Sequence, residues 1–249
     1  MLDAGSLVSL RRVSHVYNAG TSLARPALAE IELDIPPGVS VAVIGPTASG
    51  KTTLLEILAG LTVPSEGTVS RAAAPPYGAA AAMAFQRAEA QLFCATVRDD
   101  VGVGPACQGL DPVFVRRRVD AALETVGLEP DRFGDRSPFA LSEGEQRKVA
   151  LAGVLAVEPR LLVLDEVGAG LDGGARSLIM RRLGEWRRDD PGRSLVFSTH
   201  DVDEAAEADR VILLAGGRLL ADAQPATVVG DADLLGRAGL EPPLAARVA

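Results

Sequence analysis

The chain has 249 residues, 47% of them hydrophobic, and its 25 Lys and Arg against 33 Asp and Glu give a formal net charge of −8. This length and composition predict a folded protein with a substantial core. The acidic balance without a long basic tract disfavours general nucleic-acid binding. The longest apolar stretch, Val149–Val157, is far shorter than the roughly 20 residues that cross a bilayer. Since the first residues also lack the apolar core of a signal peptide, we expect a cytosolic location.

The first third of the chain predicts strands followed by a strand–loop–helix unit. Segments 6–17 and 28–35 alternate loosely with period two, which favours antiparallel strands. The run SVAVIG, residues 40–45, leads through a glycine-bearing loop into a helical pattern at 51–61, an order typical of α/β folds. The Ala-rich segment 71–85 is interpreted as a connection plus a strand.

The rest of the chain reads first as helical and then as α/β again. Between about residues 86 and 158 the clearest helices are 112–128 and 143–159, with stops near Gly127 and Pro159. We expect Arg116–Arg118 to form a solvated helix side and the cysteines Cys94 and Cys107 to be free thiols. Two buried strands follow at 160–166 and 194–200, with a helix at 175–189 between them. A hairpin at 210–223 then turns at two glycines.

A phosphate-binding motif lies between the strand at 40–45 and the helix after it. GPTASGKT, residues 45–52, satisfies G-x-x-x-x-G-K-[ST] in the required strand–loop–helix context. Backbone N–H groups and the helix dipole would hold a phosphate chain, Lys51 would reach the β and γ phosphates, and Thr52 would ligate Mg²⁺. The residues predicted to bind the nucleotide here are Gly45, Pro46, Thr47, Ala48, Ser49, Gly50, Lys51, Thr52 and Thr53.

Two acids end a second buried strand. In LLVLDE, Asp165 is predicted to hold magnesium through water, and Glu166 is predicted to act as the general base on the attacking water. One acid after an apolar run often only meets solvent. Beside a phosphate-binding loop the pair favours chemistry, because a magnesium triphosphate needs oxygen ligands opposite the phosphates.

Further motifs follow in a fixed order: FQ at 85–86, LSEGEQ at 141–146, GLD at 170–172 and STHD at 198–201. With them, nearly the whole chain resembles the nucleotide-binding subunit of ATP-binding cassette (ABC) systems. The resemblance implies an α/β P-loop NTPase core with a mainly parallel sheet, an N-terminal antiparallel β subdomain and an inserted α-helical subdomain. It implies a single domain over 1–249, with the β subdomain and P-loop part of the core at 1–85, the helical subdomain at 86–158, the rest of the core at 159–220 and a tail at 221–249.

The resemblance also implies that two such subunits sandwich two ATP molecules, each site combining one chain's P-loop with the other's signature segment. Gln86 would sense magnesium and water and couple the site to a membrane partner, and His200 would contact the γ phosphate. Asp172 would connect the two sites. Tyr17 would stack on adenine, and the signature residues at the nucleotide would be Ser142, Gly144 and Glu145.

The segment LSEGEQRKVA carries a second, purely structural pattern. Ser142 followed by Glu145 is a capping box that begins a helix. The structural and the nucleotide-binding interpretations are compatible, because a helix start with a capping box can also contact a phosphate. Glu143 replaces a signature glycine and, near that phosphate, is expected to weaken the site that this signature completes.

Two other positions also depart from the family pattern. Ala48 stands where a glycine is usual, and a position that needs a positive φ would resist it. VGAGLD, residues 167–172, replaces the usual P-T-A-G-L-D after the catalytic glutamate.

A finer resemblance lies in residues 85–105, FQRAEAQLFCATVRDDVGVGP, and in the tail. Both are similar to the energy-coupling factor ATPases that drive uptake of vitamins or of cobalt and nickel ions. The implied partners are a second ATPase subunit, identical or paralogous, a transmembrane coupling protein and a separate substrate-binding membrane protein, at the cytoplasmic face of the membrane. The alternatives are a soluble non-transport ABC ATPase and an ATP-regulated binding module without useful turnover.

Overall fold

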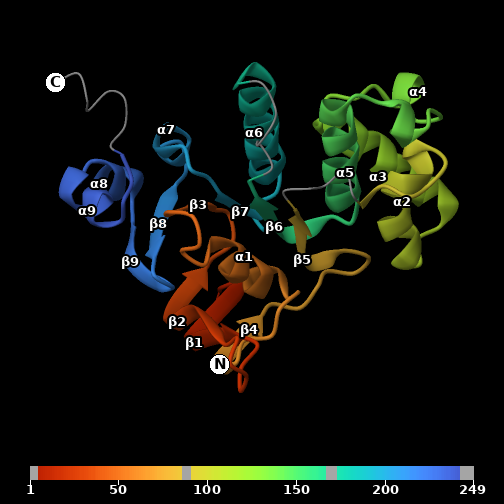
Figure 1. The fold of residues 1–249 in the computed structure, drawn as a ribbon. Helices are drawn as coiled ribbons and strands as arrows, with labels where there is room; N and C mark the ends of the chain where they lie inside the picture. Colours follow the sequence, from red (N-terminus) through yellow and green to blue (C-terminus); the bar gives the residue numbers. More distant parts are fainter. Residues whose placement is uncertain (1–4, 86–90, 167–172, 242–249) are drawn as a thin grey trace. The chain divides into compact units, whose positions relative to one another are not determined.

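The computed structural model describes residues 5–85, 91–166 and 173–241. The chain forms two compact units, Met1–Ala72 with Ser194–Ala249 and Ala73–Arg193, whose elements are labelled in Figure 1. The expected subdomain boundaries at residues 85, 158 and 220 stay predictions.

An antiparallel sheet of order β2-β1-β4 belongs to the first unit. Its strands β1, β2 and β4 span Val8–Tyr17, Arg25–Ile35 and Glu66–Arg71. Val8, Leu10 and Val13 of β1 are at most 1% exposed, and the register against β2 shifts between Leu10 and Val13. This irregularity moves the buried face from even to odd positions and explains the loose alternation of the sequence. The predicted antiparallel strands are confirmed.

The described residues of the first unit also form four further strands. β3, β7, β8 and β9 span Ser40–Ile44, Ser194–Ser198, Arg210–Ala215 and Arg218–Ala223. β3 pairs in parallel with both β7 and β8, and β8 pairs antiparallel with β9. Gly216 and Gly217 have φ of +55° and +75°, as a two-residue turn with positive φ at both positions requires. The predicted hairpin is confirmed.

Four helices lie in the described residues of the first unit: α1, α7, α8 and α9, over Lys51–Ala59, Val202–Ala205, Pro225–Val229 and Ala232–Arg237. Helix α1 is anchored by Leu54, Leu55, Ile57 and Leu58, each 0% exposed. It ends two residues before the predicted position 61, because Gly60 adopts φ +84° and its N–H bonds back to the last turn. Arg71 of β4 donates to two carbonyls of that last turn.

The second unit combines a parallel strand pair with helices. β5 (Ala79–Ala84) pairs with β6 (Pro159–Asp165), Ala84 lying opposite Leu164. Its helices are α2, α3, α4, α5 and α6, with a 3-10 turn η2: Val97–Cys107, Pro112–Thr125, Pro130–Phe133, Glu143–Ala156, Gly173–Arg188 and Pro138–Ala140. Helices α2, α3 and α5 pack against one another (Figure 1). The strand expected in the Ala-rich segment and the two clearest helices are confirmed.

The expectation that Arg116–Arg118 are all solvated is wrong for Arg118. The Arg116 side chain is 61% exposed, but that of Arg118 is 13% exposed and pairs with Glu158 at 2.8 Å. Arg118 also donates to the Tyr77 carbonyl at 2.5 Å. A charge run read from the sequence does not reveal which of its members turns back toward the rest of the fold.

Two further observations concern the described part of the chain. Cys94 and Cys107 are free. In residues 5–85, 91–166 and 173–241, no helix is both long and apolar enough to pass through a bilayer.

Candidate nucleotide-binding site

The loop between β3 and α1 approaches its neighbours too closely for side chains at two glycines. A Cβ on Gly45 would lie 2.1 Å from the Leu214 carbonyl oxygen, and one on Gly50 would lie 2.5 Å from the Ala27 carbonyl oxygen. The Gly217 N–H, in the β8–β9 turn, donates to the Ser49 carbonyl at 3.0 Å. The loop is therefore held against the hairpin, and its path is fixed before any ligand arrives.

Ala48 occupies a strained backbone position in this loop. Its φ is +62°, a region that costs a residue with a Cβ roughly 1–2 kcal/mol. The position thus needs the positive φ that the usual glycine adopts freely. The exposed methyl group of Ala48 is small enough to be accommodated there.

The amino end of α1 offers donors to an anion. Gly50 caps the helix without a side-chain hydrogen bond, and the first-turn N–H groups of such helix starts commonly bind anions. Lys51 is 6% exposed, and its Nζ donates to the carbonyls of Gly45 and Pro46 at 2.9 and 3.1 Å. This holds a positive charge over the loop.

The Ser49 hydroxyl adds a polar group that suits a ligand. Ser49 is 2% exposed, and within the described ranges its Oγ has no hydrogen-bond partner. A buried unsatisfied hydroxyl is costly. An oxygen-rich ligand such as a phosphate chain would satisfy it, so the residues present fit a bound polyphosphate.

Tyr17 lies beside this helix start, although it is far away in sequence. Its hydroxyl is 3.1 Å from the Thr53 Oγ1 and donates to the Glu56 carboxylate at 3.3 Å. The ring packs edge-on against His15, with centroids 4.6 Å apart. At 38% exposure, Tyr17 keeps part of its surface open next to the P-loop helix.

His200 reaches the same end of the sheet. It follows β7, and the Thr199 N–H donates to the Val43 carbonyl of β3 at 3.2 Å. Asp201 next to it caps α7 by accepting from Asp203 and Glu204 N–H groups. The structure therefore brings together, at the carboxyl ends of β3 and β7, the predicted P-loop and an exposed His200.

The second unit carries the predicted acids. Asp165 closes β6 and is 7% exposed, and Glu166 follows it with a left-handed φ of +50°. A non-glycine residue in this region is strained, and such strain clusters at functional sites. No pattern in the sequence predicts this conformation. Gln86 and Asp172 lie outside the described residues.

The signature segment forms the predicted capping box at the start of α5. The Ser142 side chain accepts from the Glu145 N–H at 3.4 Å, and the Glu145 carboxylate accepts from the Ser142 N–H and hydroxyl at 2.9 and 2.7 Å. These hydrogen bonds lower the pKa of Glu145. Ser142 and Glu143 are both exposed, so this capped helix start also faces outward.

The exposed side chain of Glu143 is held by an ion pair. Its carboxylate accepts from Arg147 at 2.6 Å, and the Arg147 side chain is only 13% exposed. This pair was not predicted, although the i,i+4 spacing of an acid and a base on a helix signals it. The arginine holds the negative charge of Glu143 at the helix start.

A strand, a phosphate-cradling loop, and a helix whose amino end carries a buried lysine define a P-loop nucleotide-binding protein. The ABC transporter family model matches residues 28–169, more than half of the chain, and the protein belongs to this family. It is accordingly an ATP-hydrolysing enzyme, with ATP as its substrate.

Relatives and solved structures extend this similarity along the chain. An energy-coupling factor transporter ATP-binding protein of Symbiobacterium thermophilum is 43% identical over 217 residues, covering 83% of this chain and 74% of the relative. The structure of cbiO1 from Clostridium perfringens, part of the ABC transporter complex cbiONQ, has a TM-score of 0.78 at 31% identity and covers 94% of each chain. A dimeric ATP-binding cassette bound to ADP and phosphate has a TM-score of 0.76 at 28% identity, covering 88% of this chain and 98% of the other.

Removing the Ser142 hydroxyl should lower the free energy of unfolding by about 1 kcal/mol at pH 7. Because the folded-state pKa of Glu145 is lowered, mainly by the Ser142 hydroxyl, its contribution is complete above the ordinary pKa of about 4.3. It is lost as the pH falls through the lower folded-state value. The difference in the free energy of unfolding between wild type and Ser142→Ala should therefore be largest at neutral pH and decrease in acid. Urea unfolding across a pH series measures it.

Ser137→Ala is the matched control for this series. Ser137 precedes η2 without a side-chain capping bond, so its loss should produce no pH-dependent difference. A Ser142→Ala difference that stays constant down to acid pH would contradict the role given to Glu145.

Proposed function

We propose that this chain is the ATP-hydrolysing subunit of an energy-coupling factor importer that takes up a vitamin or a transition-metal ion. One observation carries the nucleotide chemistry: the uncapped amino end of α1, with buried Lys51 and Ser49 beside it. The importer assignment is supported by 43% identity to an energy-coupling factor ATP-binding protein over 83% of this chain.

Phosphate binding falls to the residues from Gly45 to Thr53. The N–H groups of the α1 start hold the β and γ phosphates, and the Ser49 hydroxyl bonds to a phosphate oxygen. Lys51 exchanges its carbonyl partners for the phosphates, so its charge is already in place when ATP arrives. The ring of Tyr17 stacks on the adenine, which its exposed face beside Thr53 permits.

Magnesium fits the donor set as a nucleotide-bound ion. Mg²⁺ is usually held by one or two protein oxygens together with substrate phosphates, and the described residues contain no cluster of three or more potential ligands that would hold a metal alone. Thr52, Asp165 and Gln86 are proposed to hold it, directly or through water. When bound, it neutralises charge on the phosphates.

Hydrolysis is assigned to Glu166 and His200. The Glu166 carboxylate takes a proton from the attacking water as general base. His200 donates a hydrogen bond to the γ phosphate and orients the water. Gln86 senses the water and couples the site to the membrane partner.

A second ATPase subunit, identical or paralogous, would complete each site. The solved cassette dimer with ADP and phosphate supports this arrangement. The outward-facing helix start of Ser142, Gly144 and Glu145 meets the γ phosphate of the other chain's ATP, and Asp172 connects the two sites. Ser142 and Glu145 cap α5, and in the proposed dimer they also face the partner's nucleotide.

The membrane partners are a transmembrane coupling protein and a separate substrate-binding membrane protein, with this chain peripheral at the cytoplasmic face. The alternative is a soluble ABC ATPase without transport. Expressed with its genomic neighbours, the chain should co-purify with a polytopic membrane protein. Purification without such a protein, with full ATPase activity, would favour the alternative.

Glu166→Gln should lower the kcat of ATP hydrolysis by about 100-fold or more, because the amide cannot accept the proton. ATP binding should persist, since glutamine has nearly the same shape. Phosphate release and nucleotide binding are the measurements, with Glu207→Gln, at an exposed acid after α7, as the control. Near-normal turnover in Glu166→Gln would remove this residue from the role of base.

Glu143→Gly should raise the ATPase rate of the assembled transporter, because the carboxylate repels the γ phosphate across the dimer. Removing about 1 kcal/mol of repulsion corresponds to about a fivefold gain. Glu143→Gln separates charge from size: it should give most of the gain if charge is the cause. An unchanged rate in both variants would refute the hypothesis.

A further inference from the structure

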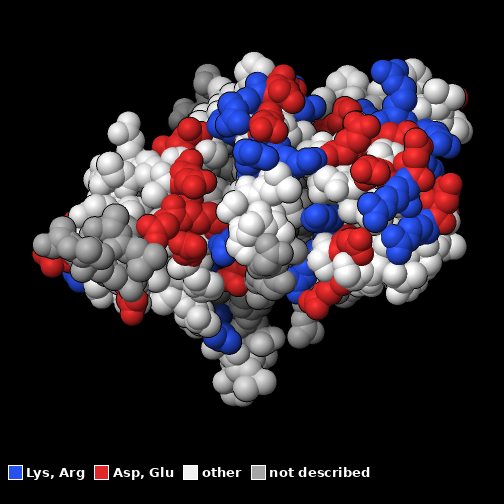
Figure 2. Space-filling model, turned by 90° about the horizontal axis from the view of Figure 1, so that it is seen from above, with Lys and Arg blue, Asp and Glu red and all other residues white. Residues whose placement is uncertain are grey.

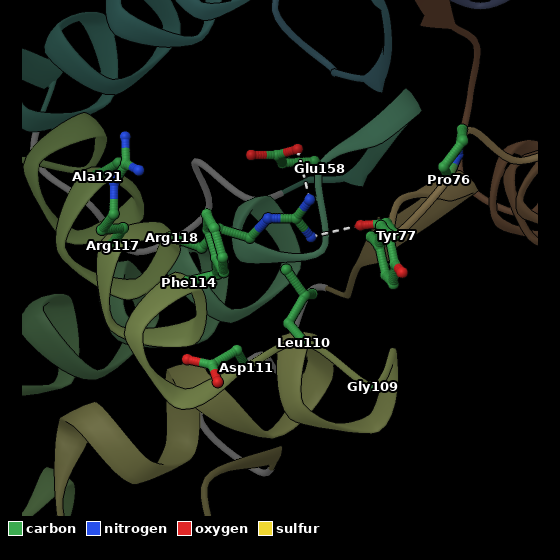
Figure 3. Close-up of a pocket in the computed structure, with 10 residues that line it drawn as sticks. All are labelled: Pro76, Tyr77, Gly109, Leu110, Asp111, Phe114, Arg117, Arg118, Ala121 and Glu158. Atoms are coloured by element: carbon green, nitrogen blue, oxygen red, sulfur yellow. Dashed lines mark hydrogen bonds and ion pairs between the residues drawn. The ribbon is translucent and has the colours of Figure 1, made fainter.

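A cavity of about 770 Å³ lies in the second unit, within the range of small-molecule sites. Figure 3 shows it between the segment before β5, the α2–α3 connection and the residue before β6. Tyr77 and Glu158 line it just ahead of these two parallel strands. Asp165 and Glu166 lie at the opposite, carboxyl end of β6, so the cavity is separate from the candidate catalytic acids.

One wall of the cavity has its charge already neutralised. Arg118 pairs with the Glu158 carboxylate at 2.8 Å and donates to the Tyr77 carbonyl at 2.5 Å and the Gln108 side chain at 2.8 Å. Figure 3 shows its guanidinium between the Glu158 carboxylate and the Tyr77 carbonyl. With the arginine committed to these acceptors, this wall is a rigid, neutral surface.

The two remaining charges of the lining differ in availability. Asp111 caps α3, its carboxylate accepting from the Val113 N–H at 2.9 Å, where the helix dipole stabilises the negative charge. Arg117 lies over the Phe114 ring, 6.0 Å from its centroid. In the described part of the chain no ion pair involves Arg117. An incoming acid would therefore find its counter-charge at Arg117.

Two aromatic rings leave apolar surface open at the cavity. Phe114 is 52% exposed and Tyr77 is 62% exposed. Tyr77 and Glu158 both have left-handed φ, +53° and +47°, which is costly for residues with a Cβ and is often associated with function. The strained backbone at Tyr77 thus carries an aromatic ring that is exposed and is not packed in a core.

We propose that this cavity binds a planar aromatic molecule that carries one negative charge. Its ring packs on Phe114 and Tyr77, and its acid group meets the guanidinium of Arg117, which already lies over an aromatic face. The neutral Arg118–Glu158 wall adds no second cation, so a polyanion gains little more than a monoanion. The proposal does not depend on the transport function.

The probe is 1-anilinonaphthalene-8-sulfonate, an aromatic monoanion whose fluorescence reports binding. It is titrated into the full chain with saturating Mg-ADP, which blocks the nucleotide site. Phe114→Ala and Arg117→Glu should each raise the Kd about tenfold. Both side chains are exposed, so the variants should fold, as circular dichroism will check.

Matched controls lie next to these residues on the same helix. Val113→Ala and Arg116→Glu change exposed side chains that do not line the cavity, and their Kd should stay within about twofold of wild type. Equal affinity in wild type, Phe114→Ala and Arg117→Glu would overturn the proposal. A matching loss in the controls would do the same.

Competition tests the two parts of the ligand class. Naphthalene-1-sulfonate should displace the probe, whereas butane-1-sulfonate and the neutral naphthalene-1-sulfonamide should need at least about tenfold higher concentrations. Equal displacement by butane-1-sulfonate would overturn the aromatic requirement. Equal displacement by the sulfonamide would overturn the requirement for charge.

Discussion

Strand β3 constrains everything around the nucleotide site. Both of its edges are paired, with β7 and with β8, and Val41–Ile44 are at most 1% exposed. Because β3 is paired on both edges, its register is fixed. The position at which the following loop begins, at the carboxyl end of the strand, is therefore fixed as well. The loop that follows is pressed against the β8–β9 hairpin, so the amino end of α1 is aimed by the sheet itself. Preorganisation of this kind is what phosphate binding requires.

The elements that local sequence signals specify were predictable. The P-loop, α1, the Gly216–Gly217 turn and the capping box depend on glycine, proline or hydroxyl groups at fixed spacing, and these act over a few residues. Contacts between distant segments were not predictable. Tyr17 meets Thr53 across 36 positions and Arg118 meets Tyr77 across 41, and no periodicity encodes such partners.

Backbone conformation also separates what can be predicted from the sequence from what cannot. Ala48 was noticed as an alanine in a glycine position, and its φ of +62° shows what that position demands. Glu166, with φ +50°, could not be anticipated, because glutamate has no intrinsic preference for this region. Each such residue costs of order 1–3 kcal/mol and persists only where surrounding structure fixes it. In both cases the paired strand before the residue supplies that support.

The hydrogen bonds of Arg118 have a mechanical consequence for the second unit. One guanidinium on α3 joins the segment before β5, the end of α2 and the residue before β6. These strands carry at their far ends the chain that leads to Gln86 and the acids Asp165 and Glu166. Helices and strands joined at this point cannot shift separately without breaking charge-assisted hydrogen bonds. The helical part and the two strands are therefore expected to move together, because the Arg118 side chain links them.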